Sequence, residues 1–134
     1  MSSGPAGGSP PRSAAVAIRR TRFGRLALFG VLVAVSLVVL FTPASDTPQL
    51  MPGLDKVVHL GLFAALALTG RWAGFPIGPL GIGLVAYAGA SEVLQGVLPL
   101  GRSGDPVDAL VDVVGIALGL VAGRRLATPL WHAR

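Results

Sequence analysis

The chain has 134 residues, which is enough for one domain. Hydrophobic residues make up 52% of it and charged residues 13%, and its mean hydropathy is +0.71, outside the range of ordinary soluble domains. The lack of cysteine excludes disulfide frameworks, thiolate nucleophiles and cysteine-ligated zinc. This composition favours a membrane protein.

The net charge of +5 does not indicate a nucleic-acid-binding protein. No basic stripe is interleaved with aromatic residues, as such a surface requires. Most of the cations instead flank the apolar runs, as the positive-inside rule expects of membrane anchors. These flanking cations are Arg19, Arg20, Arg22, Arg25, Arg124 and Arg125. We therefore expect a lipid bilayer, and no nucleic acid, as a partner.

Residues 1–17 are rich in Gly, Ser, Pro and Ala and have no apolar period, which predicts a disordered cytoplasmic tail. The first apolar run predicts a membrane span over about residues 24–41. An arginine-rich flank before an apolar run is also typical of a signal peptide. This run is long for a signal peptide, and residues 42–44 make a poor cleavage site, so we expect a retained helix.

Three further spans are predicted, over about residues 55–70, 79–98 and 106–123. Proline and glycine break the chain in segments 42–54 and 74–79, and Pro99 ends the third span. Each apolar run is roughly 16–19 residues, near the lower limit for crossing a bilayer. A short cytoplasmic tail, 127–134, completes the chain.

The predicted fold is all-α: a transmembrane bundle of four antiparallel helices within residues 18–126. Cations are concentrated before the first span, after the second and after the fourth, whereas the other side has only Lys56 and Arg102. The N- and C-termini are therefore expected in the cytoplasm and the protein in the plasma membrane, crossing it several times.

Polar residues collect at the opposite, extracytoplasmic ends of the spans. Consecutive spans alternate in direction, so the start of the second, the end of the third and the start of the fourth share one membrane face. Ionisable residues within spans are costly and by default indicate function. The residues at this face are Asp55, Lys56, His59, Glu92, Gln95, Arg102, Asp105, Asp108 and Asp112.

Small residues indicate which helix faces meet. Gly115, Gly119 and Gly123 form a stripe on the fourth span that continues to Asp112, and a small-residue face of the third span leads to Glu92. The sequence therefore predicts that the third and fourth spans pack together by these faces, with both acids turned inward.

Several of these residues also have a purely structural interpretation. Asp105 before Pro106, and Asp55 after Gly53, suit helix N-caps. Gln95 would then only bond between helices, His59 would only fill space, and Glu92 would only form an ion pair that fixes the bundle. As functional groups, the cluster suits a divalent metal ion, acid–base chemistry on a lipid-linked substrate, or capture of an anionic headgroup. The spacing does not choose among them.

The polar pattern resembles the VanZ-like family of small polytopic membrane proteins over about residues 50–123. One departure is Asp112, where family members usually have Asn. The matching motifs, in order, are Asp55-Lys56-x-x-His59, Glu92-x-x-Gln95, Gly101-Arg102-x-x-Asp105-x-x-Asp108 and Asp112-x-x-Gly115-x-x-x-Gly119.

The resemblance implies a membrane bundle whose prototype is associated with bacterial resistance to teicoplanin, an antibiotic that binds cell-wall precursors. Our leading hypothesis is a cell-envelope protein that binds or modifies an anionic lipid or cell-wall intermediate. The candidates for catalysis are His59, Glu92 and Asp108, and those for substrate binding are Lys56, Gln95, Arg102 and Asp112. The alternative is a non-enzymatic structural or accessory subunit, and a transporter comes third. Enzymatic activity, cofactors, a metal and homo-oligomerisation stay open.

Overall fold

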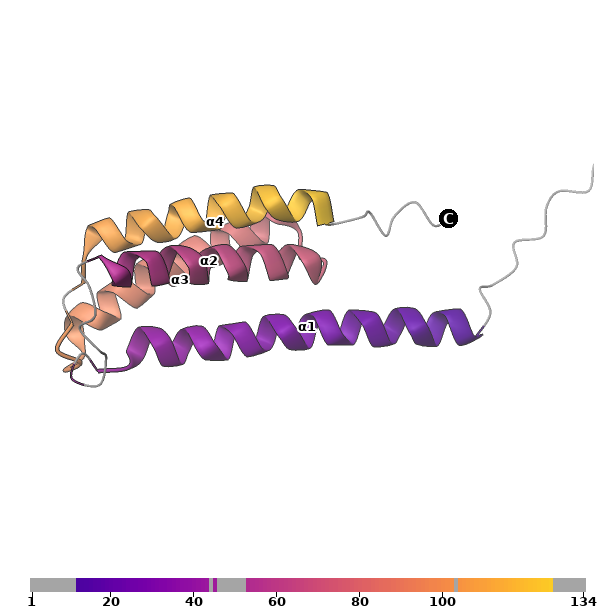
Figure 1. The fold of residues 1–134 in the computed structure, drawn as a ribbon, viewed down its shortest axis with the longest axis horizontal. Helices are drawn as coiled ribbons and strands as arrows, with labels where there is room; N and C mark the ends of the chain where they lie inside the picture. Colours follow the sequence, from indigo (N-terminus) through magenta and orange to yellow (C-terminus); the bar gives the residue numbers. More distant parts are fainter. Residues whose placement is uncertain (1–11, 44, 46–52, 103, 127–134) are drawn as a thin grey trace, which may run out of the picture.

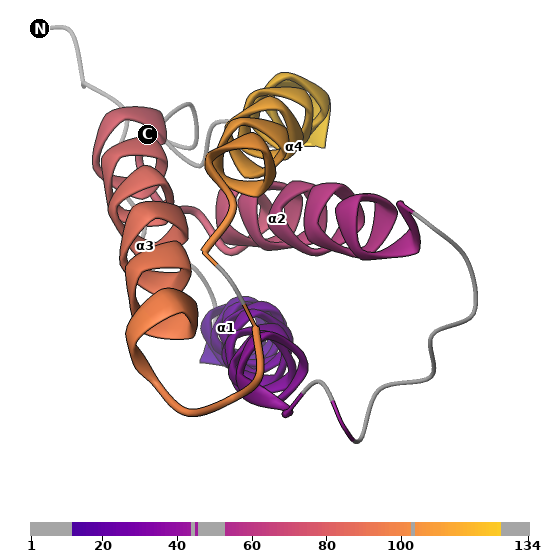
Figure 2. The same ribbon diagram turned by 90° about the vertical axis from the view of Figure 1, so that its left-hand side faces the viewer.

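The computed structural model describes residues 12–43, 45, 53–102 and 104–126, and these form four helices. The predicted all-α class is confirmed for this part of the chain. The helices are α1 (Arg12–Phe41), α2 (Leu54–Trp72), α3 (Ile77–Val97) and α4 (Pro106–Leu126). Figure 1 shows that consecutive helices run in alternating directions along the long axis. Seen along that axis, α2 and α3 are inclined in different directions (Figure 2), so the axes of the four helices are not all aligned as in a regular bundle.

Three helices are long and apolar enough to cross a membrane: α1 from Arg19 onward, α3 and α4 up to Arg125. The remaining helix, α2, carries Asp55 and Lys56 in its first turn and Arg71 in its last. Its uncharged stretch is therefore limited to the 14 residues from 57 to 70.

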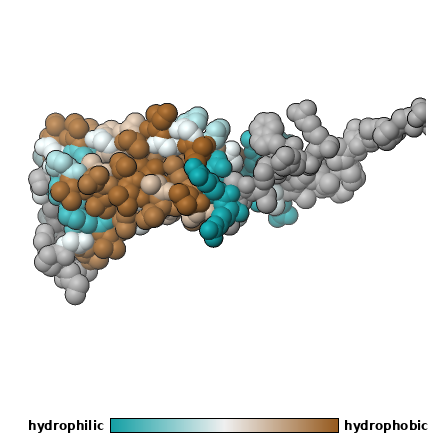
Figure 3. Space-filling model, turned by 90° about the horizontal axis from the view of Figure 1, so that it is seen from above, coloured by the Kyte–Doolittle hydropathy of each residue, from teal (hydrophilic) through white to brown (hydrophobic). Residues whose placement is uncertain are grey.

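The outer surface of the helices is apolar, while several polar side chains are buried. Ile82 and Val97 are 75% and 77% exposed, and Val38 on α1 is 67% exposed. In Figure 3 the hydrophobic colour covers most of the helical body. The buried polar residues are Ser36, His59, Ser91, Glu92, Gln95, Asp108 and Asp112. An apolar exterior this extensive suits hydrocarbon better than water and indicates a membrane protein.

The glycine stripe of α4 packs against α2, so the prediction that it packs against α3 was wrong. A Cβ on Gly115 would lie 2.5 Å from the Leu60 carbonyl oxygen, and one on Gly119 would overlap the backbone of Ala64. On α3, Gly89, one of the small residues that precede Glu92, is exposed and has open space at its Cβ position. The reason is that α2 presents small side chains, Ala64 and Ala67, to the stripe, which lets the two backbones approach closely.

The apolar core lies between the helices and includes Phe63, Leu66 and Leu84. The Phe63 ring contacts Tyr87 of α3 at 5.6 Å between centroids. The Tyr87 hydroxyl is in turn 2.9 Å from the Ser36 hydroxyl of α1. This contact joins three of the helices below the polar end of the molecule.

The chain is helical from Arg12, so residues 12–17 of the predicted disordered tail belong to α1. Residues 13–17 include three alanines, the residue type with the highest helix propensity, which explains the added turns. At the other end α4 continues three residues past the expected 123. Residues 1–11 and the predicted tail 127–134 lie outside the described residues.

One end of the helices is basic and aromatic. The Arg25 guanidinium lies 5.1 Å from the centroid of the Trp72 ring, and its Nη1 donates to the Trp72 carbonyl at 3.4 Å. Arg71 is in the last turn of α2, and Arg124 and Arg125 are in the last turn of α4. Arginine beside tryptophan at helix ends is typical of a membrane interface.

Candidate functional site

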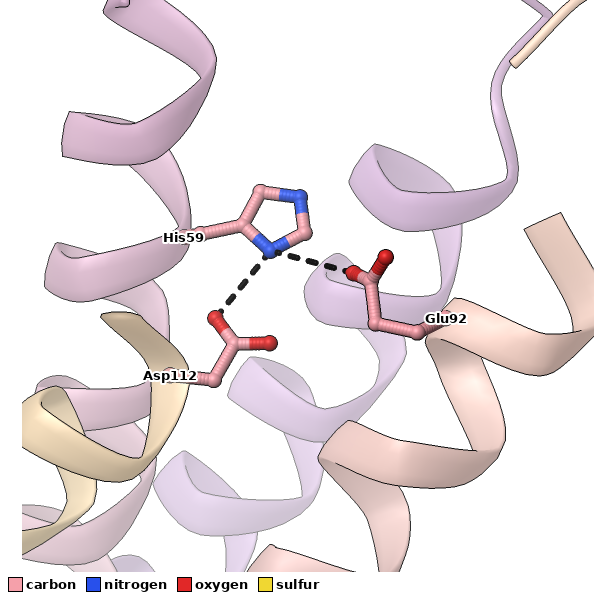
Figure 4. Close-up of side chains that lie close together, drawn as sticks. All are labelled: His59, Glu92 and Asp112. Carbon is pink, nitrogen blue, oxygen red and sulfur yellow. Dashed lines mark hydrogen bonds and ion pairs between the residues drawn. The ribbon is translucent and has the colours of Figure 1, made fainter. Parts of the chain in front are cut away.

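Three buried side chains from three helices meet at the other end of the molecule (Figure 4): His59 of α2, Glu92 of α3 and Asp112 of α4. We call these three residues the polar centre. The His59 Nδ1 lies 3.1 Å from Asp112 Oδ1 and 3.8 Å from Glu92 Oε1. His59, Glu92 and Asp112 are 3%, 7% and 0% exposed. The predicted meeting of Glu92 with Asp112 therefore occurs, with His59 between them.

Close backbone contacts bring the three residues together. Gly115 lies against the Leu60 carbonyl, and this close contact places Asp112, one turn earlier on α4, next to α2. The loop before α4 lies equally close to α3, because a Cβ on Gly104 would be 2.6 Å from the Glu92 carbonyl oxygen. From this loop the Asp105 N–H donates to Glu92 Oε2 at 2.9 Å, which fixes the carboxylate.

The polar centre is not fully satisfied by the protein. Glu92 Oε1 and Asp112 Oδ2 are buried and have no hydrogen-bond partner among the described residues. Buried polar atoms are almost always paired, since leaving one unpaired costs about 1–3 kcal/mol. Both oxygens belong to carboxylates beside one imidazole, so the polar centre has room for a further hydrogen-bond donor or a cation.

Lys56 forms a second layer above the polar centre. Its Nζ donates to Asp108 Oδ1 at 2.6 Å and to Asp105 Oδ2 at 3.0 Å, and lies 4.0 Å from Asp55. Asp108, predicted as a catalytic partner of His59, thus pairs with Lys56 instead. Asp112, predicted to bind substrate, is the acid that contacts His59. The two acids are one turn apart on the same face, so the sequence alone did not separate their partners.

The structural interpretation of Asp105 as a helix cap is confirmed, although the residue does more than cap. Its Oδ1 accepts the Val107 N–H at 2.8 Å, at the start of α4. The Lys56 ammonium and this N–H hold the pKa of the Asp105 carboxyl below its ordinary value. For Asp55 the cap interpretation was wrong: the N-cap is Gly53, with φ of 83°, and Asp55 follows in the first turn of α2.

Gln95 and Arg102, both predicted to bind substrate, bond to the end of α1. Gln95 Nε2 donates to the Leu40 carbonyl at 2.8 Å, and Arg102 Nε donates to the Thr42 carbonyl at 3.0 Å. The Gln95 contact agrees with its interpretation as an interhelical bond. Sequence reasoning missed the pair Ser36 and Tyr87, although a lone serine inside an apolar run was a usable signal.

The charge of this end does not favour an anion held directly by Lys56 and Arg102. Among the described residues at this end five carboxylates stand beside these two cations, a net charge of −3 with all five ionised and His59 neutral. Both cations already donate to protein oxygens. An open hollow of about 250 Å³ lies near the α2–α3 turn, lined by Phe29, Phe75, Pro79, Leu80, Gly83 and Leu84, and this hollow is apolar.

No protein-family model, curated protein or solved structure matches this chain. Function is therefore argued from the polar centre itself.

Proposed function

We propose that this chain is a VanZ-like, multi-pass protein of the plasma membrane, whose polar centre binds or acts on an anionic lipid or cell-envelope precursor. The observation that carries the proposal is the polar centre: an imidazole and two carboxylates, drawn from three helices, with two buried oxygens left unpaired. The order and spacing of the family-like motifs also support it, since their residues gather at one end.

In the proposed orientation the basic, aromatic end faces the cytoplasm. Arg25, Arg71 and Trp72 lie at that end, together with the last turn of α4. The acidic end then faces outward, as the positive-inside rule favours. The first turn of α2 tolerates this position because Lys56 is neutralised by Asp105 and Asp108.

Cysteine labelling tests the orientation, since the chain has no cysteine of its own. Gly101 has φ of 65°, so a side chain there would be strained. Pro99 is exposed at the same end and suits the purpose better. A Pro99→Cys protein should react with a membrane-impermeant maleimide in intact cells, whereas Gly78→Cys, at the opposite end, should react only after lysis. The reverse pattern would reject the proposed topology.

For the chemistry, in the metal-free centre Asp112 orients His59 by accepting a hydrogen bond from Nδ1–H, an arrangement that leaves the second ring nitrogen to act as a general base. Figure 4 shows the second ring nitrogen of His59 on the side away from both carboxylates. If the polar residues only held the helices together, simple interhelical hydrogen bonds would be enough. Gln95 with the Leu40 carbonyl and Ser36 with Tyr87 are bonds of this kind. The unpaired oxygens of Glu92 and Asp112 favour the functional proposal over the structural one.

Expression in a susceptible Gram-positive host tests this function. The wild-type chain should raise teicoplanin tolerance, and Glu92→Gln should remove that gain at an unchanged membrane level of the protein. Asp55→Asn is the matched control, because Asp55 is an exposed acid at the same end, 4.0 Å from Lys56 and outside the polar centre. Full tolerance with Glu92→Gln at normal protein level would reject the proposal.

A further inference from the structure

We propose that the polar centre is a binding site for one divalent metal ion of the zinc class, held by His59, Glu92 and Asp112. Each residue offers one ligand atom, and the three ligand atoms lie within 4.8 Å of one another. Three protein ligands with a fourth position left open are typical of catalytic rather than structural zinc, and both imidazole and carboxylate are zinc ligands.

The spacing of the ligand atoms supports a single shared ion. Zinc lies about 2.0–2.2 Å from nitrogen and oxygen ligands, so neighbouring ligands of a tetrahedral ion are about 3.3–3.6 Å apart. The His59 Nδ1 lies 3.1 Å from Asp112 Oδ1 and 3.8 Å from Glu92 Oε1, on either side of that range. All three ligand atoms lie within 4.8 Å of one another, so the Glu92 and Asp112 carboxylates would approach each other by up to about 1 Å to share one tetrahedral ion, and the ion would replace the Nδ1 proton of His59.

The charge of the polar centre also calls for a cation. With both carboxylates ionised and the imidazole neutral, the centre would carry a charge of −2 in an almost fully buried position, which is costly without compensation. Among the described residues, the ionic contacts of Glu92 and Asp112 are to His59 alone. Lys56 does not compensate them, because its ammonium is bonded to Asp105 and Asp108. One divalent ion would bring the centre to neutrality.

The unpaired oxygens are a second, independent observation. Glu92 Oε1 is one of the atoms facing His59, and Asp112 Oδ2 belongs to the other carboxylate of the centre. Both residues are more than nine-tenths buried. A bound ion would satisfy Glu92 Oε1 directly, while Glu92 Oε2 keeps its bond from the Asp105 N–H.

The metal also resolves a difficulty in anion recognition. An end whose described residues carry more carboxylates than cations repels phosphate, but a metal with an open position binds a phosphate oxygen directly. This last step rests on the proposed function, whereas the metal site itself does not.

Zinc binding by the purified full-length protein tests the inference. His132 is replaced by Gln in every protein, so that His59 supplies the only imidazole. After treatment with EDTA and its removal, titration with ZnCl₂ should give one ion per chain. Glu92→Gln and Asp112→Asn should each weaken binding at least tenfold, and Asp55→Asn should leave it unchanged. Equal affinity in all four proteins, or no binding by the parent, would overturn the metal site.

Cobalt provides a test that needs no variant. Co²⁺ added to the metal-free parent protein should give the visible absorption of a four- or five-coordinate ion, and zinc should displace it. A spectrum identical to that of aqueous Co²⁺ would refute the site even if the variants failed to fold. Zinc binding without teicoplanin tolerance supports the metal site and rejects the proposed function. If teicoplanin tolerance requires Glu92 but the protein binds no zinc, the proposed function is supported and the metal site is rejected.

Discussion

Replacing Gly119 by valine is expected to destabilise the protein by about 3 kcal/mol, at the upper end of the cost of overpacking. Even one added Cβ would overlap the Ala64 carbonyl oxygen and lie 2.7 Å from the Ala67 Cβ. Backbone atoms of α2 cannot rotate away as a flexible side chain does, so α4 would have to withdraw. The free energy of unfolding in an SDS titration, followed by tryptophan fluorescence, measures the loss.

Gly61→Val is the matched control for this variant. Gly61 lies on α2, the partner helix, and nothing lies within 4 Å of its Cβ position. The same residue type is thus introduced on an exposed face, and we expect less than about 1 kcal/mol of change. Equal destabilisation by the two variants would show that the close α2–α4 contact is not what the glycine stripe provides.

Replacing His59 by leucine is the second change with a large expected effect. It leaves the Asp112 and Glu92 carboxylates in an apolar interior without the imidazole, their one ionic partner among the described residues. Removing one member of a buried ionic contact typically costs about 3–5 kcal/mol, since the other charge stays buried. We expect a loss of about 3 kcal/mol, measured in EDTA so that bound metal does not contribute.

Lys56→Met serves as a comparison for His59→Leu. The Lys56 side chain is 36% exposed, so water can partly replace its contacts with Asp105 and Asp108. It should therefore destabilise less than His59→Leu. A larger loss of stability in Lys56→Met than in His59→Leu would show that the contacts of Lys56 with Asp105 and Asp108 stabilise the protein more than those of His59.

Local patterns in the sequence predicted the helices and the end where polar residues gather. Apolar run length, proline breaks and flanking arginines locate α2, α3, α4 and the end of α1 to within about three residues, because these signals are local in the sequence. The start of α1 was missed, since helix propensity in residues 12–17 outweighs their lack of an apolar period.

The pairing of side chains depended on helix contacts that the sequence does not fix. The glycine stripe indicates a close partner but not which helix supplies it, and the partner is α2. That choice, together with the loop contact at Gly104, decides that Asp112 meets His59 while Asp108 meets Lys56. Both acids share one face of α4, so periodicity treats them alike.

His59 and Asp112 are direct partners in a buried centre, and a double-mutant cycle measures the coupling between them. The cycle compares the free energies of unfolding of the wild type, His59→Leu, Asp112→Ala and the double variant, all in EDTA. We predict a coupling of about 2 kcal/mol, with the double variant more stable than His59→Leu alone because no unpaired carboxylate is left at position 112. Additive losses from the two substitutions would show that His59 and Asp112 are not direct partners.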